Sequence, residues 1–117
     1  MSEWSAVSPI YLQLRGKVLQ GILNGSLPEG EAVPSVRQVA AEEKINPITV
    51  SKAYQMLVDE ELLEKRRGLG LFVQPGARDK ALHQERELFL REEWPDIRAR
   101  IVSLGLDARA LFEEQPQ

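Results

Sequence analysis

The spacing of apolar residues predicts a first helix between Pro9 and Asn24. Its apolar positions recur every three or four residues and are Ile10, Tyr11, Leu14, Val18, Leu19, Ile22 and Leu23. Proline is tolerated at the first position of a helix, and Ser8 before it is a candidate N-cap. Gly25 can adopt the left-handed conformation that often ends a helix. The stretch 27–34 is rich in proline and glycine, so an extended connector is expected there.

Two short helices separated by a tight turn are expected after the connector. Ser35 and Gln38 stand three residues apart, as in a capping box, where each side chain bonds to the other residue's amide. The helix that they begin should end near Glu43. Asn46 can cap the next helix and Pro47 can be its first residue. Two helices joined by so short a turn have the spacing of a helix-turn-helix.

The second of these helices has two faces of different chemistry. Its apolar stripe consists of Val50, Ala53, Tyr54, Leu57 and Val58. At about 100° per residue, the opposite face carries Ile48, Lys52, Gln55 and Asp59, flanked by Thr49 and Ser51. The beginning of this face holds one charge and mostly short polar side chains, so a duplex can approach it closely.

A hairpin is expected next, because the apolar residues at 62–63 and 71–73 flank a turn that Gly68 and Gly70 permit. Pro75 and Gly76 close the hairpin. The predicted fold class is therefore mainly α with a small β-hairpin, a winged helix-turn-helix at 1–76.

The remaining residues, 77–117, predict a short all-helical segment. Its apolar residues follow helical spacing, with a break or kink at Trp94 and Pro95 because proline removes a backbone hydrogen bond. Asp107 is a candidate cap for a last short helix. This segment has too few apolar residues to form a core alone and exposes an amphipathic surface, so dimerisation is expected. The residues expected at the dimer interface are Leu88, Phe89, Trp94, Ile97, Ile101, Leu104, Leu111 and Phe112.

Composition excludes several classes of function. A chain of 117 residues with no cysteine and one histidine has no disulfide, thiolate zinc site or cysteine nucleophile. We find no nucleophile–base pair, metal cluster or phosphate loop, so neither an enzyme nor a cofactor is indicated. No apolar run is long enough to span a membrane, and residues 1–8 lack the features of a secretory signal, so a cytoplasmic location is expected.

The net charge of −3 argues at first against a nucleic-acid partner, since DNA binding depends on lysine and arginine. The distribution of charge weakens this objection. Residues 33–78 hold seven basic and six acidic side chains, whereas 79–117 hold six basic and nine acidic ones. The acidic excess therefore lies mainly in the tail.

Three motifs stand in one order: 33–37 at the start of the first short helix, 46–57 in the second, and 62–73 in the hairpin. Together they resemble the GntR family of bacterial regulators, and the start of the 46–57 motif and the short tail look most like its YtrA-type branch. The likeness covers roughly residues 9–75. It implies a dimeric DNA-binding repressor, often of transporter genes, with double-stranded operator DNA as its partner.

By position, the resemblance implies DNA contacts from all three motifs. The residues concerned are Ser35, Arg37, Asn46, Ile48, Thr49, Ser51, Lys52, Arg66, Arg67, Gly68 and Gly70. Their chemistry agrees, because a helix N-terminus and arginine bind phosphate, and Asn, Ser, Thr and Lys can bond to base edges. Plainer interpretations stay open: Ser35 and Asn46 as helix caps only, Arg37 as the partner of a nearby glutamate, and the hairpin as a solvated charged loop.

Two residues depart from the family's usual pattern. Relatives often carry a polar or basic side chain where this chain has Ile48, which offers only apolar contact, for instance with a thymine methyl group. Leu69 at the hairpin tip is similarly unusual. These departures leave the operator sequence open.

Two further alternatives concern partners. Phe89, Trp94 and Phe112 could line a pocket for an unknown small-molecule effector, although packing at the dimer interface is favoured. A winged-helix module that binds a protein instead of DNA is the second functional hypothesis, which the acidic net charge would suit. If two copies pair, their recognition helices lie about one turn of DNA apart, and the operator is approximately palindromic.

Overall fold

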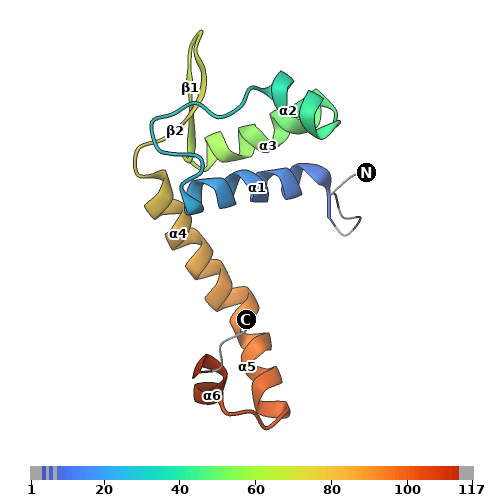
Figure 1. Cartoon of the computed structure of the whole chain (residues 1–117), viewed down its shortest axis with the longest axis vertical. Helices are drawn as coiled ribbons and strands as arrows, with labels where there is room; N and C mark the ends of the chain where they lie inside the picture. Colours follow the sequence, from blue (N-terminus) through green and yellow to red (C-terminus); the bar gives the residue numbers. More distant parts are fainter. Residues whose placement is uncertain (1–3, 5, 7, 114–117) are drawn as a thin grey trace. The chain divides into compact units, whose positions relative to one another are not determined.

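The computed structural model describes residues 4, 6 and 8–113, and the chain divides into two compact units, Met1–Leu82 and His83–Gln117 (Figure 1). The described residues of the first unit form three complete helices, a two-stranded hairpin and the start of a fourth helix. The helices are α1 (Ile10–Asn24), α2 (Val36–Glu43) and α3 (Pro47–Asp59). The predicted winged helix-turn-helix is confirmed.

The start of α1 differs from the prediction. Pro9 directly precedes the helix, and no side chain caps it, so the capping role expected of Ser8 is wrong. The Ser8 carbonyl instead accepts a hydrogen bond from the Gln13 side chain at 2.7 Å. At the other end the prediction is confirmed, because Gly25 takes the left-handed conformation, with φ of 87°.

The cap of α2 follows only half of the predicted box. The Ser35 hydroxyl accepts from the Gln38 amide at 3.1 Å, as expected. The Gln38 side chain does not reach back to Ser35 but donates to Glu42 at 3.2 Å. Residues four apart lie on the same side of a helix, so Glu42 offers a charged acceptor along the surface of α2. The helix ends at Lys44, whose φ of 58° begins the tight turn into α3.

The hairpin pairs β1 (Leu63–Arg66) with β2 (Gly70–Val73) in antiparallel register. The predicted extended connector lies along its free side: Ala32 bridges to Phe72, and the Val33 amide donates to the Leu71 carbonyl at 2.9 Å. This arrangement fixes the base of the hairpin beside the entry to α2.

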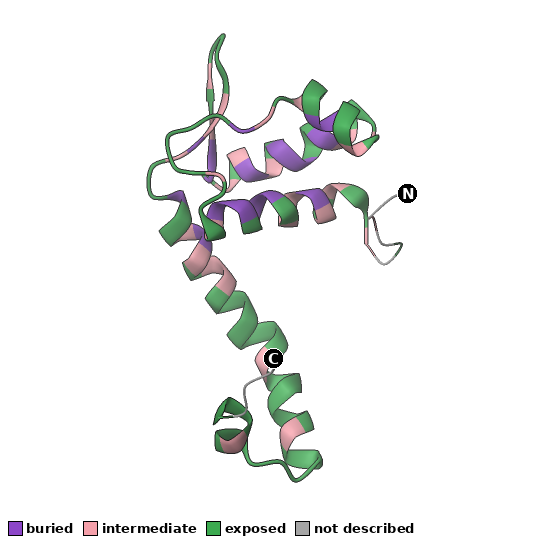
Figure 2. Ribbon diagram, in the orientation of Figure 1, coloured by how far each residue is buried: buried purple, intermediate pink, exposed green. Residues whose placement is uncertain are grey.

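One hydrophobic core fills the first unit (Figure 2). The apolar stripes that periodicity predicted for α1 and α3 supply much of it, together with residues from the hairpin and the connector. The largest fully buried side chains are Ile22, Val50, Leu57, Leu62, Leu63 and Val73. The face of α3 opposite this core is left free.

The first turns of α4 (Ala77–Leu88) belong to the same unit. Ala77 and Ala81 are buried in the core, and the Lys80 ammonium pairs with Glu61 at 2.9 Å. This pairing lowers the pKa of Glu61. The sequence suggested a domain boundary between residues 76 and 77, whereas the compact unit extends to Leu82 because these contacts fix the start of α4 to it.

The second unit contains the rest of α4, a π-helical turn η1 (Phe89–Glu93), α5 (Trp94–Ser103) and α6 (Ala108–Glu113). The interruption expected at Trp94 and Pro95 takes the form of the π turn, in which the Trp94 amide donates to the Phe89 carbonyl. The helix does not stop there, because Pro95 falls in the first turn of α5, where its missing N–H is tolerated. The Asp107 carboxylate accepts from the Arg109 amide at 3.1 Å and thus caps α6 as predicted. None of the helices in the described part of the chain has the length and apolar character needed to cross a membrane.

Candidate nucleic-acid interface

The N-terminus of α2 presents Ser35 and Arg37 to solvent. Arg37 makes no ion pair or hydrogen bond with the described residues. The glutamates proposed as its alternative partners are otherwise engaged, since Glu42 accepts from Gln38 and Glu43 faces the Lys17 ammonium at 3.5 Å. The Arg37 guanidinium is therefore available to an external anion next to the free amides of a helix N-terminus.

The outward face of α3 begins with Asn46, whose side chain accepts from the Ile48 amide at 2.8 Å. Ile48 is 76% exposed, and Ser51 is exposed on the same side of the helix. Thr49 differs from the other predicted contact residues of α3, because it is half-buried. The exposed surface is thus formed by Ile48 and Ser51, with Gln55 one turn further on, where the Gln55 side-chain amide donates to Asp59 at 2.9 Å.

Lys52 is positioned by a contact that periodicity could not reveal. Its ammonium lies 4.0 Å from the centre of the Tyr11 ring. Sequence reasoning placed Tyr11 only in the apolar stripe of α1, but the ring also attracts the cation through its π face. The Lys52 charge is therefore held at the side of α3 that faces the start of α1.

The two predicted arginines of the wing, which is the hairpin formed by β1 and β2, have different environments. The Arg66 guanidinium donates twice to Glu64, at 2.8 and 3.1 Å, and its central carbon lies 4.1 Å from the centre of the Phe72 ring. Arg67 is exposed and makes no such contact within the described residues. Arg67 is thus free to meet DNA, whereas Arg66 would first have to leave its carboxylate partner.

The glycines of the wing are required by backbone conformation. Gly68 and Gly70 have φ angles of 75° and 113°, which other residues rarely adopt. An added Cβ would meet nothing within 4 Å at either position. The Leu69 amide closes the turn by donating to the Arg66 carbonyl at 2.8 Å, and the Leu69 side chain is 71% exposed.

A shallow groove between α3 and the wing contains a basic residue that the predicted set omitted. Its lining residues are Val36, Ser51, Tyr54, Gln55, Val58, Lys65 and Leu71. Lys65 points to the opposite face of β1 from Arg66, since side chains alternate along a strand. The period-two pattern would have found it, because buried Leu63 lies on the same face. A second hollow lies between α2 and the start of α3 and is lined by Val36, Arg37, Ala40, Ala41, Ile45 and Pro47.

Comparison with known proteins identifies the family. Residues 10–73, which run from α1 to the end of β2, match the family described as "Bacterial regulatory proteins, gntR family". The chain belongs to the GntR family. The predicted resemblance and the expected function of a transcriptional regulator are thereby confirmed.

Individual relatives extend the GntR likeness beyond the matched region. YhcF of Bacillus subtilis, an uncharacterized HTH-type transcriptional regulator, is 27% identical over 112 residues, which are 96% of this chain and 91% of YhcF. The HTH-type transcriptional repressor YtrA of the same organism is 38% identical over 71 residues, 61% of this chain and 55% of YtrA. This chain thus matches about half the length of YtrA. A solved GntR-family regulator from Bacteroides thetaiotaomicron superposes with a TM-score of 0.72 at 31% identity, covering 90% of this chain and 91% of that one.

In this GntR-family chain, Tyr54, which sequence reasoning assigned only to the core, also holds together the elements predicted to contact DNA. Its hydroxyl donates to the Pro34 carbonyl at 2.7 Å, directly before the Ser35 cap. Burial raises the pKa of Tyr54 to about 12, so the hydroxyl keeps its proton. This bond fixes the entry to α2 against α3 and makes Tyr54 a positioning residue.

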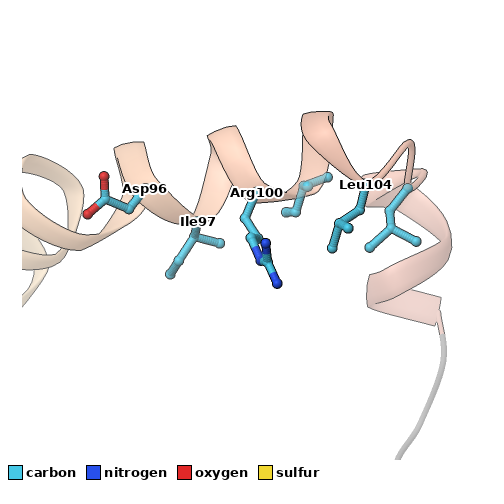
Figure 3. A pocket seen from close by; sticks show the side chains of 6 residues that line it. Asp96, Ile97, Arg100 and Leu104 are labelled. Atoms are coloured by element: carbon cyan, nitrogen blue, oxygen red, sulfur yellow. The ribbon is translucent and has the colours of Figure 1, made fainter.

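In the second unit of this GntR-family protein, none of the eight residues predicted at a dimer interface is buried. Ile97, Ile101 and Leu104 come together with Leu106 in an apolar groove on α5, edged by Asp96 and Arg100 (Figure 3). Sequence reasoning had omitted Leu106 from this set.

The predicted aromatic residues of the second unit lie outside the groove. The Phe89 and Trp94 rings contact each other with centroids 6.4 Å apart, and Phe112 is 84% exposed. The groove itself is lined by aliphatic and charged side chains. An effector pocket formed by these aromatics stays a prediction.

Proposed function

We propose that this protein represses an operon by binding, as a homodimer, an approximately palindromic operator. The observation that carries the proposal is the exposure of polar and basic residues on α2, α3 and the wing, on the faces turned away from the core. α3 enters the major groove, where Ser51 and Gln55 reach base edges. Arg37 and the amides at the start of α2 bind phosphate, and Arg67 of the wing binds the adjoining backbone.

Dimerisation is supported by the exposed apolar groove of the second unit. Ile97, Ile101 and Leu104 would be covered by the same surface of another copy, as in a two-fold interface. Two copies then place their α3 helices about 34 Å apart, one turn of DNA. The protein acts in the cytoplasm by binding rather than by catalysis, without a cofactor. Transporter genes are the proposed targets, with release by a signal that acts on the tail.

The first experiment measures the affinity for duplexes selected from sheared genomic DNA, as a function of salt concentration. We expect the logarithm of the binding constant to fall by about 0.9 per neutralised phosphate for each tenfold rise in salt. Arg37→Glu and Lys52→Glu should abolish selective binding. If sequence-specific binding survives both charge reversals, or if it does not change with salt, the DNA-binding proposal fails and a protein partner for the winged helix becomes the better hypothesis.

The two wing arginines provide a matched pair of variants. Arg67→Ala should reduce the slope of the logarithm of the binding constant against the logarithm of salt concentration by about 0.9 for each bound wing, because one phosphate contact is lost. Arg66→Ala should change the slope less, because this guanidinium is already bonded to Glu64. Equal losses in the two variants would show that Arg66 leaves Glu64 when DNA binds.

A further inference from the structure

Ile48 places an aliphatic side chain at the N-terminal end of the outward face of α3. It is the second residue of the helix and is 76% exposed. At about 100° per residue it points almost directly away from the core residues Ala53 and Leu57. No described residue covers it.

Exposure alone gives Ile48 no role, because single apolar side chains are common on protein surfaces. Its surroundings distinguish it. Ile48 lies in the N-terminal part of the second helix of a helix-turn-helix, the part that meets base edges when this motif binds DNA. Its neighbours on the same face are the short side chain of Ser51, the cap Asn46 and Lys52. Because the Lys52 ammonium lies over the Tyr11 ring, the isoleucine is not screened by a longer polar group.

The local structure also holds Ile48 in a fixed direction. Asn46 fixes the Ile48 amide through the cap hydrogen bond of 2.8 Å. A β-branched side chain has one strongly preferred χ1 rotamer in a helix, so little freedom is left to lose on binding. Lys52, one turn further on, is drawn to the Tyr11 ring and leaves the space beside Ile48 open.

Isoleucine can neither donate nor accept a hydrogen bond, so it cannot read the polar pattern of a base pair. The apolar group that base pairs present in the major groove is the 5-methyl group of thymine. We propose that Ile48 selects thymine at one position of each half-site by packing against this methyl group. The inference rests on the DNA-binding function proposed above and adds one specificity-determining residue to it.

The test uses the full chain and a duplex selected from a random-sequence library. Each thymine of the selected duplex is replaced singly by deoxyuridine, which removes the methyl group and keeps the base pair. We expect one position per half-site at which this change weakens binding about fourfold, the value for losing one buried methyl group. Ile48→Ala should bind more weakly and lose its sensitivity to deoxyuridine at that position, whereas Ile48→Val should keep it.

Leu69→Ala is the matched control, because Leu69 is almost as exposed but lies at the tip of the wing. The Leu69→Ala variant should lose as much affinity as the parent protein when the sensitive thymine is replaced by deoxyuridine. Unfolding midpoints of all variants should equal that of the parent protein, since both residues are exposed. Failure to enrich any duplex would refute the proposed function itself. If a duplex is enriched but no thymine in it is sensitive to deoxyuridine, only the thymine contact is refuted. The same holds if Ile48→Ala loses as much affinity on deoxyuridine substitution as the parent protein.

Discussion

In the unit Met1–Leu82, side chains from the helices and the hairpin close over one core, whereas in the described part of His83–Gln117 no side chain is buried. The two units nevertheless have similar helical patterns in the sequence. The difference shows that an amphipathic pattern predicts a helix but not what will cover its apolar face. In the first unit the chain covers its own apolar face, and in the described part of the second unit the apolar face is exposed.

The largest expected effect is the removal of a core side chain from the first unit. Leu57→Ala should lower the free energy of unfolding by about 2–5 kcal/mol, because Leu57 is fully buried and its truncation leaves a cavity. Urea denaturation followed by circular dichroism measures this loss. Leu104→Ala in the second unit, where the side chain is 55% exposed, is the comparison. Equal losses would mean that both units depend on burial to the same extent.

A charge placed in the apolar groove of the second unit should have the next largest effect. Leu104→Glu should raise the dissociation constant of the proposed homodimer at least tenfold, about 1.4 kcal/mol, because a charged carboxylate would be removed from water at the interface. Sedimentation over a range of concentrations measures the constant. Ala99→Glu adds the same charge on the opposite side of α5 and should leave self-association unchanged. An equal weakening by both variants would place the interface elsewhere.

Much of the first unit could be predicted because its determinants are local. Ser35 and Asn46 cap the helices that follow them, Gly25 ends α1, and the stripe around Leu57 has helical period. Each of these features needs only a few consecutive residues. The hairpin was equally predictable, since Gly68 and Gly70 permit its turn.

The chemistry of the site was less predictable, because it depends on contacts between distant segments. The sequence cannot show that Lys52 rests on Tyr11, 41 positions earlier, or that the Tyr54 hydroxyl bonds to Pro34. The predicted set named Arg66 and Arg67 of the wing and omitted Lys65, which strand alternation directs to the groove beside α3.

Tyr54→Phe tests how far the core of the first unit also orders its DNA-facing surface. Loss of the hydrogen bond to the Pro34 carbonyl should lower the free energy of unfolding by about 1 kcal/mol and weaken DNA binding, because the start of α2 is released. Urea denaturation and operator titration measure the two effects. Tyr11→Phe is the matched control, since it keeps the ring under Lys52 and removes a hydroxyl without a hydrogen bond to any described residue. If the two variants change the free energy of unfolding and DNA binding equally, Tyr54 is not a positioning residue.

The smallest expected effect concerns the place where the first unit ends. The Glu29 carboxylate accepts from the Gly76 amide at 2.8 Å and the Arg78 amide at 3.1 Å, and so ties the connector to the beginning of α4. These two amides lower the pKa of Glu29. The stabilisation is therefore present above the unfolded pKa, about 4.5, and is lost as the pH falls through the lower folded value.

Glu29→Gln should remove this part of the pH dependence and change stability little at acidic pH, where the parent carboxyl is protonated. Thermal unfolding midpoints between about pH 3 and pH 7 measure the difference, which should grow as the pH rises from the folded pKa to the unfolded value of about 4.5 and remain constant above it. Glu31→Gln, two residues away and exposed, should retain the parent profile. If Glu29→Gln retains it too, the carboxylate does not hold α4 to the winged helix. The start of α4 would then be held by the burial of Ala77 and Ala81, the Lys80–Glu61 ion pair and the hydrogen bond from the Arg78 side chain to the Leu23 carbonyl.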